Sequence, residues 1–240
     1  HLMSAKAASP EYIVMEDSTD YSTNFMILDK HEIDVATRIR VLNESSEEAK
    51  NIFKEVNQTL DRNLSDIIFS GSQEQLNKTE NAQPAITATS LACLAVFKEK
   101  YPNFEPSATA GHSLGEYSAL VAASCLTFAT ALELVQKRGE LMSTYGKGEM
   151  VALPISRNIA EPLAITHFCG ISACNLPEQT VIGGLPSDID KVLSGLRESH
   201  PPLKSTRLQT DGAFHTYYLA HAAIYFSPFL ATADFEFNTA

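Results

Sequence analysis

Hydrophobic and polar residues follow two different patterns along the chain. From Ser45 to Met142 the apolar residues recur at helical spacing, whereas beyond Gly148 short apolar runs alternate with helical segments. The first pattern predicts a mainly helical region, and the second predicts a small lobe in which strands and helices alternate. We therefore expect an α/β chain in which a small lobe is inserted into a larger domain.

The helical region opens on Ser45-Ser46-Glu47-Glu48, where a hydroxyl cap and early carboxylates predict a first helix with Phe53 on its apolar face. A polar turn is expected at 75–80. Pro84 is then expected in the first turn of a long apolar helix. Backbone amides in a first turn have no intrahelical acceptor, so the amide hydrogen that proline lacks is not missed there. Two further helices are predicted at 116–123 and 127–142.

The predicted organisation has three parts. Residues 1–40 form a lead-in of uncertain structure, 41–148 together with 208–240 form the large part, and 149–207 form the small inserted part. The expected strands are 108–110, 150–155, 171–174, 180–183 and 204–208, and the remaining expected helices are 159–168, 189–199 and 217–232.

Composition narrows the classes of partner. The chain has 240 residues, of which 44% are hydrophobic and 20% charged, as in ordinary globular proteins. A net charge of −11 argues against non-specific binding to nucleic acid or to an anionic membrane. The four cysteines match no zinc or thioredoxin spacing, so we expect reduced cysteines in the core. No apolar run has the length of a membrane-spanning helix, and we expect a soluble, cytoplasmic protein.

The run Gly111-His112-Ser113-Leu114-Gly115 is the strongest chemical signal. It lies between a predicted strand and a predicted helix, the context in which Gly-x-Ser-x-Gly forms a sharp elbow that exposes the serine hydroxyl. Many matches to this pattern are plain turns, and the placement favours the elbow. We expect Ser113 to be a nucleophile that carries an acyl group as an ester. The amide of Leu114 would donate to the oxyanion.

A serine nucleophile needs a base. His215, in the run Gly212–Thr216, follows a predicted strand and a glycine, so we expect it on a loop that overhangs the elbow. A helix-capping or surface histidine is the alternative. His112 is a second candidate base, although adjacent side chains on an elbow point apart. Asp188 and Asp190 are placed to complete a triad but resemble a helix cap, which favours a Ser/His dyad.

Arg138 lies on the predicted helix that follows the elbow helix. A lone arginine is usually a solvated charge. It can also point into a site and bind a carboxylate with two parallel hydrogen bonds. The residues alone leave both interpretations open.

Several runs together resemble the malonyl-CoA:acyl-carrier-protein transacylases and the acyltransferase domains of fatty acid and polyketide synthases. The run 111–120 is similar to the nucleophile motif of that family, 76–85 to its glutamine motif, 137–139 to its arginine motif and 212–216 to its histidine motif. Residues 175–182 match the run of its small lobe. The similarity extends from about Ser45 to Phe237.

The resemblance implies an α/β-hydrolase-like large subdomain with a parallel sheet and an inserted ferredoxin-like small subdomain. It implies that Ser113 takes the acyl group from coenzyme A and that His215 acts as base and then as acid. Arg138 would pair with the free carboxylate of malonate, which favours a dicarboxylic acyl unit. The residues assigned to organise the oxyanion and the site are Leu114, Gln83 and His112, and Asn175 is assigned to the edge of the small lobe.

The function implied is transfer of malonyl from malonyl-CoA to the phosphopantetheine thiol of an acyl carrier protein, including free-standing enzymes that serve polyketide synthases. Malonyl-CoA is then a substrate and not a cofactor, and no metal or redox cofactor is implied. The alternatives are an editing acyl hydrolase on the same scaffold and a catalytically impaired docking domain. The family's opening Gly-Gln-Gly-Ser-Gln run has no match between Ser4 and Asn43, and its later segments have none before Ala240. We therefore expect the chain to be part of a longer protein.

Overall fold

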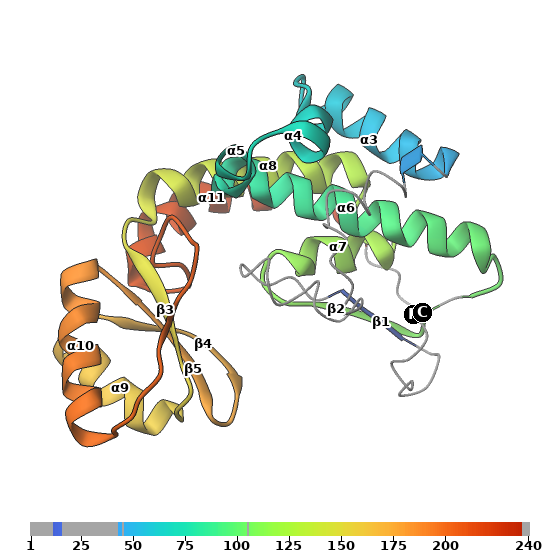
Figure 1. Cartoon of the computed structure of the whole chain (residues 1–240). Coiled ribbons are helices and arrows are strands. Elements are labelled where there is room, and N and C mark those ends of the chain that lie inside the picture. Colours follow the sequence, from blue (N-terminus) through green and yellow to red (C-terminus); the bar gives the residue numbers. More distant parts are fainter. Residues whose placement is uncertain (1–11, 16–42, 45, 105, 237–240) are drawn as a thin grey trace. The chain divides into compact units, whose positions relative to one another are not determined.

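The computed structural model describes residues 12–15, 43–44, 46–104 and 106–236 (Figure 1). These residues divide between two units, each with its own internal packing. The first unit comprises residues 1–139 and 229–240, and the second comprises 140–228. Helices and strands occur in both, so the predicted α/β class is confirmed. Most of the predicted lead-in lies outside the described residues.

The first unit is mainly helical. Its helices are α3 (Glu47–Thr59), α4 (Leu64–Ser70), α5 (Gln73–Asn77), α6 (Thr79–Lys100), α7 (Gly115–Ala122) and the first part of α8 (Phe128–Tyr145). The first helix forms as predicted, because the Ser46 side chain accepts from the Ala49 amide at 3.2 Å. Phe53, Leu64 and Leu132 bring α3, α4 and α8 into one buried cluster, which also contains residues of α6.

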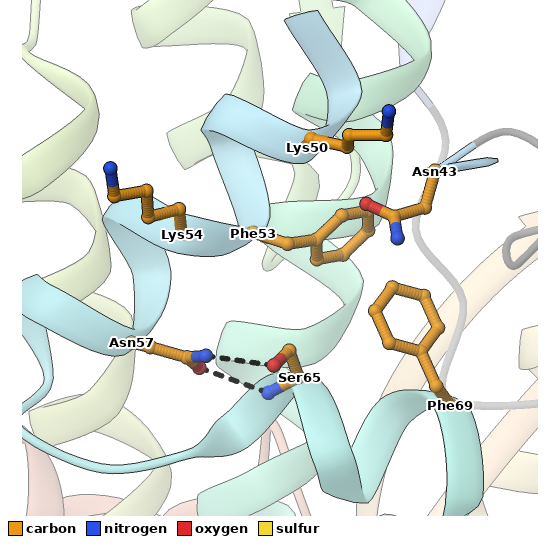
Figure 2. A pocket seen from close by; sticks show the side chains of 7 residues that line it. All are labelled: Asn43, Lys50, Phe53, Lys54, Asn57, Ser65 and Phe69. Carbon is orange, nitrogen blue, oxygen red and sulfur yellow. Dashed lines mark hydrogen bonds between the residues drawn. The ribbon is translucent and has the colours of Figure 1, made fainter. Parts of the chain in front are cut away.

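A groove lies between α3 and α4 and is lined by residues of both helices, among them Phe53, Asn57, Ser65 and Phe69 (Figure 2). Phe53 and Phe69 meet edge to face across it, with ring centroids 4.8 Å apart. Asn57 ties the two helices together, since its Nδ2 donates to Ser65 Oγ at 2.7 Å and its Oδ1 accepts from the Ser65 amide at 3.0 Å. The turn that joins α3 to α4 is therefore held by side-chain hydrogen bonds as well as by apolar packing.

The long helix α6 departs from the expectation. The predicted polar turn at 75–80 is wrong, because Ser72 and Gln75 form a capping box that starts α5 and because α6 already begins at Thr79. Pro84 therefore lies inside α6 and not in its first turn. The carbonyl of Glu80, four residues earlier, loses its intrahelical donor and accepts instead from Arg62 Nη2 at 3.1 Å.

Two short parallel strands lead to the predicted nucleophile. Strand β1 (Tyr12–Met15) pairs with β2 (Ala108–Gly111), with Tyr12 opposite Ala108 and Met15 opposite Gly111. The predicted strand at 108–110 is confirmed. The β2 strand ends at Gly111, and α7 starts at Gly115, so Ser113 lies in the connection between them.

The second unit is built on a four-stranded antiparallel sheet with the order β4-β5-β3-β6. Its elements follow in the order β3 (Glu149–Leu153), α9 (Arg157–Thr166), β4 (Gly170–Leu176), β5 (Gln179–Gly184), α10 (Pro186–Ser199) and β6 (Thr206–Arg207). The strands and helices predicted within 149–207 are therefore confirmed, with ends shifted by a few residues. The last predicted helix is divided into a 3-10 turn, Tyr217–Leu219, and α11 (Ala220–Thr232).

The two faces of this sheet bury different groups. Val151 and Ile182 pack against α9 and α10, which both cover that face (Figure 1). Met150 and Val181 point to the other face, in a cluster with Phe214 and Met142. Alternation along the strands explains the two sets. The second unit consequently extends beyond 149–207, because residues from the end of α8 and from the loop before α11 complete its core.

In the part of the chain that the structure describes, no helix combines the length and the apolar character needed to cross a membrane.

Candidate active site

Ser113 occupies a strained turn between β2 and α7. Its φ of +54° lies in the left-handed region, which a residue with a side chain rarely adopts. The turn brings Gly111 against Gly115 so closely that a Cβ on Gly111 would lie 2.0 Å from the Gly115 carbonyl carbon. Both glycines of the Gly-x-Ser-x-Gly pattern are therefore in contact here, and the predicted elbow is confirmed.

Backbone amides gather just after the elbow. The amides of Gly115 and Glu116 donate to the carbonyls of His112 and Ser113 at 3.0 and 3.3 Å, which closes the first turn of α7 tightly. Leu114 caps this helix, and its side chain is buried. Because a helix N-terminus carries partial positive charge, the start of α7 is suited to stabilising a negative charge near Ser113. The side chain of His112, by contrast, is exposed.

Arg138 joins the elbow to the long helix. Its Nη2 donates to Ser113 Oγ at 2.8 Å, and its Nη1 donates to Gln83 Oε1 at 2.6 Å. Gln83 projects from α6 and is only 5% exposed, whereas Arg138 projects from α8. Three segments far apart in the sequence thus place a serine hydroxyl, an amide and a guanidinium within one chain of hydrogen bonds. Arg138 is therefore hydrogen-bonded at the elbow and is not a solvated charge, whereas its binding of a substrate carboxylate stays a prediction.

Tyr117, on the first turn of α7, interacts electrostatically with the Arg138 guanidinium. Burial raises the pKa of Tyr117 above its ordinary value, the Arg138 guanidinium acts in the opposite direction, and Glu116 adds to the rise. The phenol therefore keeps its proton at neutral pH, beside a guanidinium that remains charged.

The other two predicted site residues belong to the second unit. His215 is exposed and has a φ of +60°, directly after the buried Phe214. The loop before it is anchored where the Ala213 amide donates to the Gly146 carbonyl at 2.9 Å. Asn175 lies exposed near the end of β4. The structure thus brings Ser113, Gln83 and Arg138 together in one unit, and it places His215 and Asn175 in the other.

Sequence reasoning missed one residue beside this site. Arg62 contacts α6 and α8 through partners that are 18, 19 and 74 positions away in the chain. No local pattern marks an arginine whose partners are so distant. The one available signal was Pro84. A proline inside a helix leaves the carbonyl four residues earlier, that of Glu80, without its amide donor, so this carbonyl needs another donor.

The predicted core position of the cysteines is confirmed for Cys169, which is buried, and is wrong for Cys93 and Cys174, which are exposed. Over 43–44, 46–104 and 106–236, the structure groups no three histidine, cysteine, aspartate or glutamate side chains as a metal ion would require.

The elbow at Ser113 defines an α/β protein of the serine-elbow class. An arginine and a buried glutamine accompany the serine. A model of the acyl transferase domain family matches residues 40–236, which is most of the chain. The chain belongs to this family.

The chain is similar to several characterised relatives. It is 37% identical over 187 residues to the malonyl CoA-acyl carrier protein transacylase of Bacillus subtilis, an alignment that covers 73% of the chain and 57% of that protein. It is 34% identical over 201 residues to the polyketide biosynthesis malonyl CoA-acyl carrier protein transacylase BaeC of Bacillus velezensis, covering 79% of the chain and 67% of that protein. The chain thus spans between about half and two thirds of the length of these relatives.

The fold of the chain is also similar to solved structures of malonyl transferases. An acyl-carrier-protein S-malonyltransferase from Burkholderia pseudomallei matches with a TM-score of 0.79 and 26% identity, over 94% of the chain and 71% of that protein.

Proposed function

We propose that the protein moves a malonyl group from coenzyme A, through an ester on Ser113, to the phosphopantetheine thiol of an acyl carrier protein. The observation that carries the proposal is the pair of hydrogen bonds from Arg138 to Ser113 and Gln83. Membership of the acyl transferase domain family and the names of the similar proteins support it. The enzyme would work on a cytoplasmic carrier protein, without a metal or a redox cofactor.

The contact between Arg138 and Ser113 gives the selectivity a physical basis. A guanidinium binds a carboxylate with two parallel hydrogen bonds, and a single methylene separates the carboxylate of malonate from its reacting carbonyl. A carboxylate that binds Arg138 therefore brings that carbonyl close to Ser113 Oγ, which lies 2.8 Å from Nη2. Acetyl has no group for this interaction, so the arrangement favours malonyl.

In the first half-reaction His215 would accept the hydroxyl proton of Ser113 while Oγ attacks the thioester carbonyl carbon of malonyl-CoA. The oxyanion of the tetrahedral intermediate would be stabilised by the Leu114 amide at the N-terminus of α7. The carbon–sulfur bond then breaks, His215 returns the proton to the sulfur, and free coenzyme A leaves. The products are coenzyme A and malonyl-Ser113.

In the second half-reaction the thiol of the carrier's phosphopantetheine would give its proton to His215 and attack the ester carbonyl. The carbon–oxygen bond breaks, and Ser113 Oγ takes the proton back. The malonyl group ends as a thioester on the carrier, and the enzyme returns to its starting form. The two steps together exchange one thioester for another, so no net redox change or water is needed.

We also propose a fold for each of the two subdomains. The order β3-α9-β4-β5-α10-β6 with the sheet order β4-β5-β3-β6 supports a ferredoxin-like small subdomain. The parallel pair β1–β2 followed by the elbow supports an α/β-hydrolase-like large one. Asn175 would then lie at the edge of the site on the small subdomain.

Incubation with malonyl-CoA followed by intact mass analysis tests the proposal. We expect one malonyl adduct on the wild-type protein, none on Ser113→Ala, and loss of the adduct when a holo-carrier protein is added. Ser143→Ala is the matched control, because Ser143 is an exposed serine of α8 with no role in the proposed reaction, and it is expected to leave adduct formation unchanged. Release of free malonate in place of transfer would indicate a hydrolase. Absence of any adduct on folded wild-type protein would indicate a docking domain.

A further inference from the structure

Arg62 links the two helices that carry Gln83 and Arg138. Its guanidinium donates to three oxygens: Asn81 Oδ1 through Nη1 at 2.6 Å, the Glu80 carbonyl through Nη2 at 3.1 Å, and Gln136 Oε1 through Nη2 at 2.6 Å. The first two belong to the start of α6, and the third belongs to α8. One side chain thus bonds both helices.

The turn that carries Arg62 is itself well ordered. Asn57 Nδ2 donates to Ser65 Oγ at 2.7 Å (Figure 2). The same nitrogen donates to Asn63 Oδ1 at 2.9 Å, and the Arg62 amide donates to the Asn57 carbonyl at 3.2 Å. Side-chain hydrogen bonds of this kind hold the backbone of a turn without help from regular secondary structure. The guanidinium is therefore presented to α6 and α8 from a fixed support.

The two side chains that Arg62 contacts lie on the opposite side of the helices from Gln83 and Arg138. Asn81 and Gln83 are two residues apart on α6, and Gln136 and Arg138 are two residues apart on α8. Two residues along an α-helix turn the side chain by about 200°. The helix pair is consequently bonded on one side through Arg62 and on the other through the Arg138–Gln83 hydrogen bond.

Close packing makes this pair sensitive to small movements. A Cβ on Gly139 of α8 would lie 2.8 Å from the Thr79 carbonyl oxygen of α6. The backbones therefore approach closely at the point where both sets of hydrogen bonds are made. Pro84 adds to the dependence on Arg62, because the Glu80 carbonyl has no amide donor at position 84.

We propose that Arg62 is a positioning residue that sets Arg138 relative to Gln83 and Ser113, and thereby the selectivity for a carboxylate-bearing acyl group. This role rests on the proposed malonyl transfer. Arg62 acts through Gln136 and the first turn of α6. Without it, α8 and α6 are free to shift by a fraction of a hydrogen-bond length, which weakens a two-point carboxylate contact more than it weakens attack by the serine.

The test compares Ser113 acylation by malonyl-CoA and by acetyl-CoA, measured as single-turnover rates over a range of substrate concentrations. In Arg62→Met and Gln136→Leu, the malonyl-to-acetyl ratio is expected to fall by about tenfold, the effect of losing one hydrogen bond to a charged group. The change should appear in the KM for malonyl-CoA, with acetyl transfer nearly constant. Gln136→Glu keeps an acceptor oxygen for Arg62 and is expected to keep the ratio.

Ile68→Val is the control for stability. Ile68 is buried in α4, so this variant loses packing without touching the Arg62 hydrogen bonds. Its malonyl-to-acetyl ratio should equal that of the wild type, which separates loss of positioning from loss of stability. If Arg62→Met does not fold, the pair Gln136→Leu and Gln136→Glu decides the question on its own.

Two outcomes overturn the inference in distinguishable ways. A wild-type protein that forms no malonyl adduct overturns the proposed function and this role with it. A wild-type protein that prefers malonyl, together with an unchanged ratio in folded Arg62→Met or Gln136→Leu, overturns the positioning role alone.

Discussion

Arg138 Nη2 donates a hydrogen bond to Ser113 Oγ at 2.8 Å, so the cation that is expected to bind the substrate carboxylate also contacts the nucleophile. A malonyl carboxylate and the serine hydroxyl then compete for the same nitrogen. A positive charge beside Oγ also favours the alkoxide that forms during attack. The proposed binding of the carboxylate and the activation of Ser113 would then be coupled through one side chain.

Removing this guanidinium should change substrate preference more than it changes reactivity. We expect Arg138→Ala to slow Ser113 malonylation by about 100-fold, since a charged two-point contact contributes roughly 3 kcal/mol. Acetylation should change much less, and Arg138→Lys should fall between the wild type and Arg138→Ala. Rapid-quench mass analysis of the acyl-enzyme measures both rates. Equal losses for malonyl and acetyl would mean that Arg138 serves the reaction and not the recognition of the carboxylate.

Gln83 holds the other end of the same guanidinium, with an Nη1 to Oε1 distance of 2.6 Å. We expect Gln83→Glu to be more harmful than Gln83→Met, because a buried carboxylate next to Arg138 would occupy and neutralise the guanidinium that malonate needs. Malonyl acylation should fall by about a further tenfold relative to Gln83→Met. Steady-state kinetics with malonyl-CoA compare the two variants. A faster Gln83→Glu enzyme would contradict this account.

Gly111 makes the elbow possible. In Gly111→Ala the new Cβ would lie 2.0 Å from the Gly115 carbonyl carbon, which the turn cannot accommodate without moving Ser113. We expect a loss of about 3 kcal/mol in the free energy of unfolding, as for other severe backbone clashes. Malonyl adduct formation should also be lost. Urea unfolding and intact mass analysis report the two effects.

The control for that variant is Gly195→Ala in α10, where a Cβ would be 3.3 Å from the flexible end of Leu163. This substitution should be tolerated, because the neighbouring side chain can move and alanine is a good helix former. A stable Gly111→Ala protein that still forms the adduct would show that the turn does not need its glycine.

Cys169 makes the second unit sensitive to alkaline pH. Burial raises its pKa from 9.0 to about 11; the Asp188 carboxylate adds to this rise, and Lys191 opposes it. Between these two values the unfolded chain releases a thiol proton that the folded chain keeps, so the free energy of unfolding falls as the pH rises. The stabilisation is complete below pH 9 and is lost as the pH approaches 11.

A comparison with Cys169→Ala isolates this contribution. By pH 10 the wild type should have lost about 1 kcal/mol more than the variant, relative to pH 8. Urea unfolding at both pH values measures the difference, and the cavity left by the variant cancels because it is present at both. Parallel pH dependence of the two proteins would exclude Cys169 as the source.

Local patterns predicted much of the fold. The hydroxyl cap at Ser46 and the helical spacing of Phe53 and Val56 located α3, and alternating apolar residues located the strands of the second unit. The first turn of α6 was predicted wrongly. Proline excludes an intrahelical hydrogen bond but not a helix, provided that another donor reaches the free carbonyl. That donor is Arg62, 22 positions before Pro84, and no rule of local spacing anticipates it.

The sequence by itself determined the elbow, because this turn is a local structure made by Gly111, Ser113 and Gly115 within five residues. It also identified Gln83 and Arg138 as candidates through family resemblance. Only the tertiary structure decided that these two side chains meet at Ser113 and that Arg62 bonds the two helices from the other side. Helical spacing specifies which face of a helix is buried, whereas the packing of α6 on α8 specifies which buried polar groups become partners.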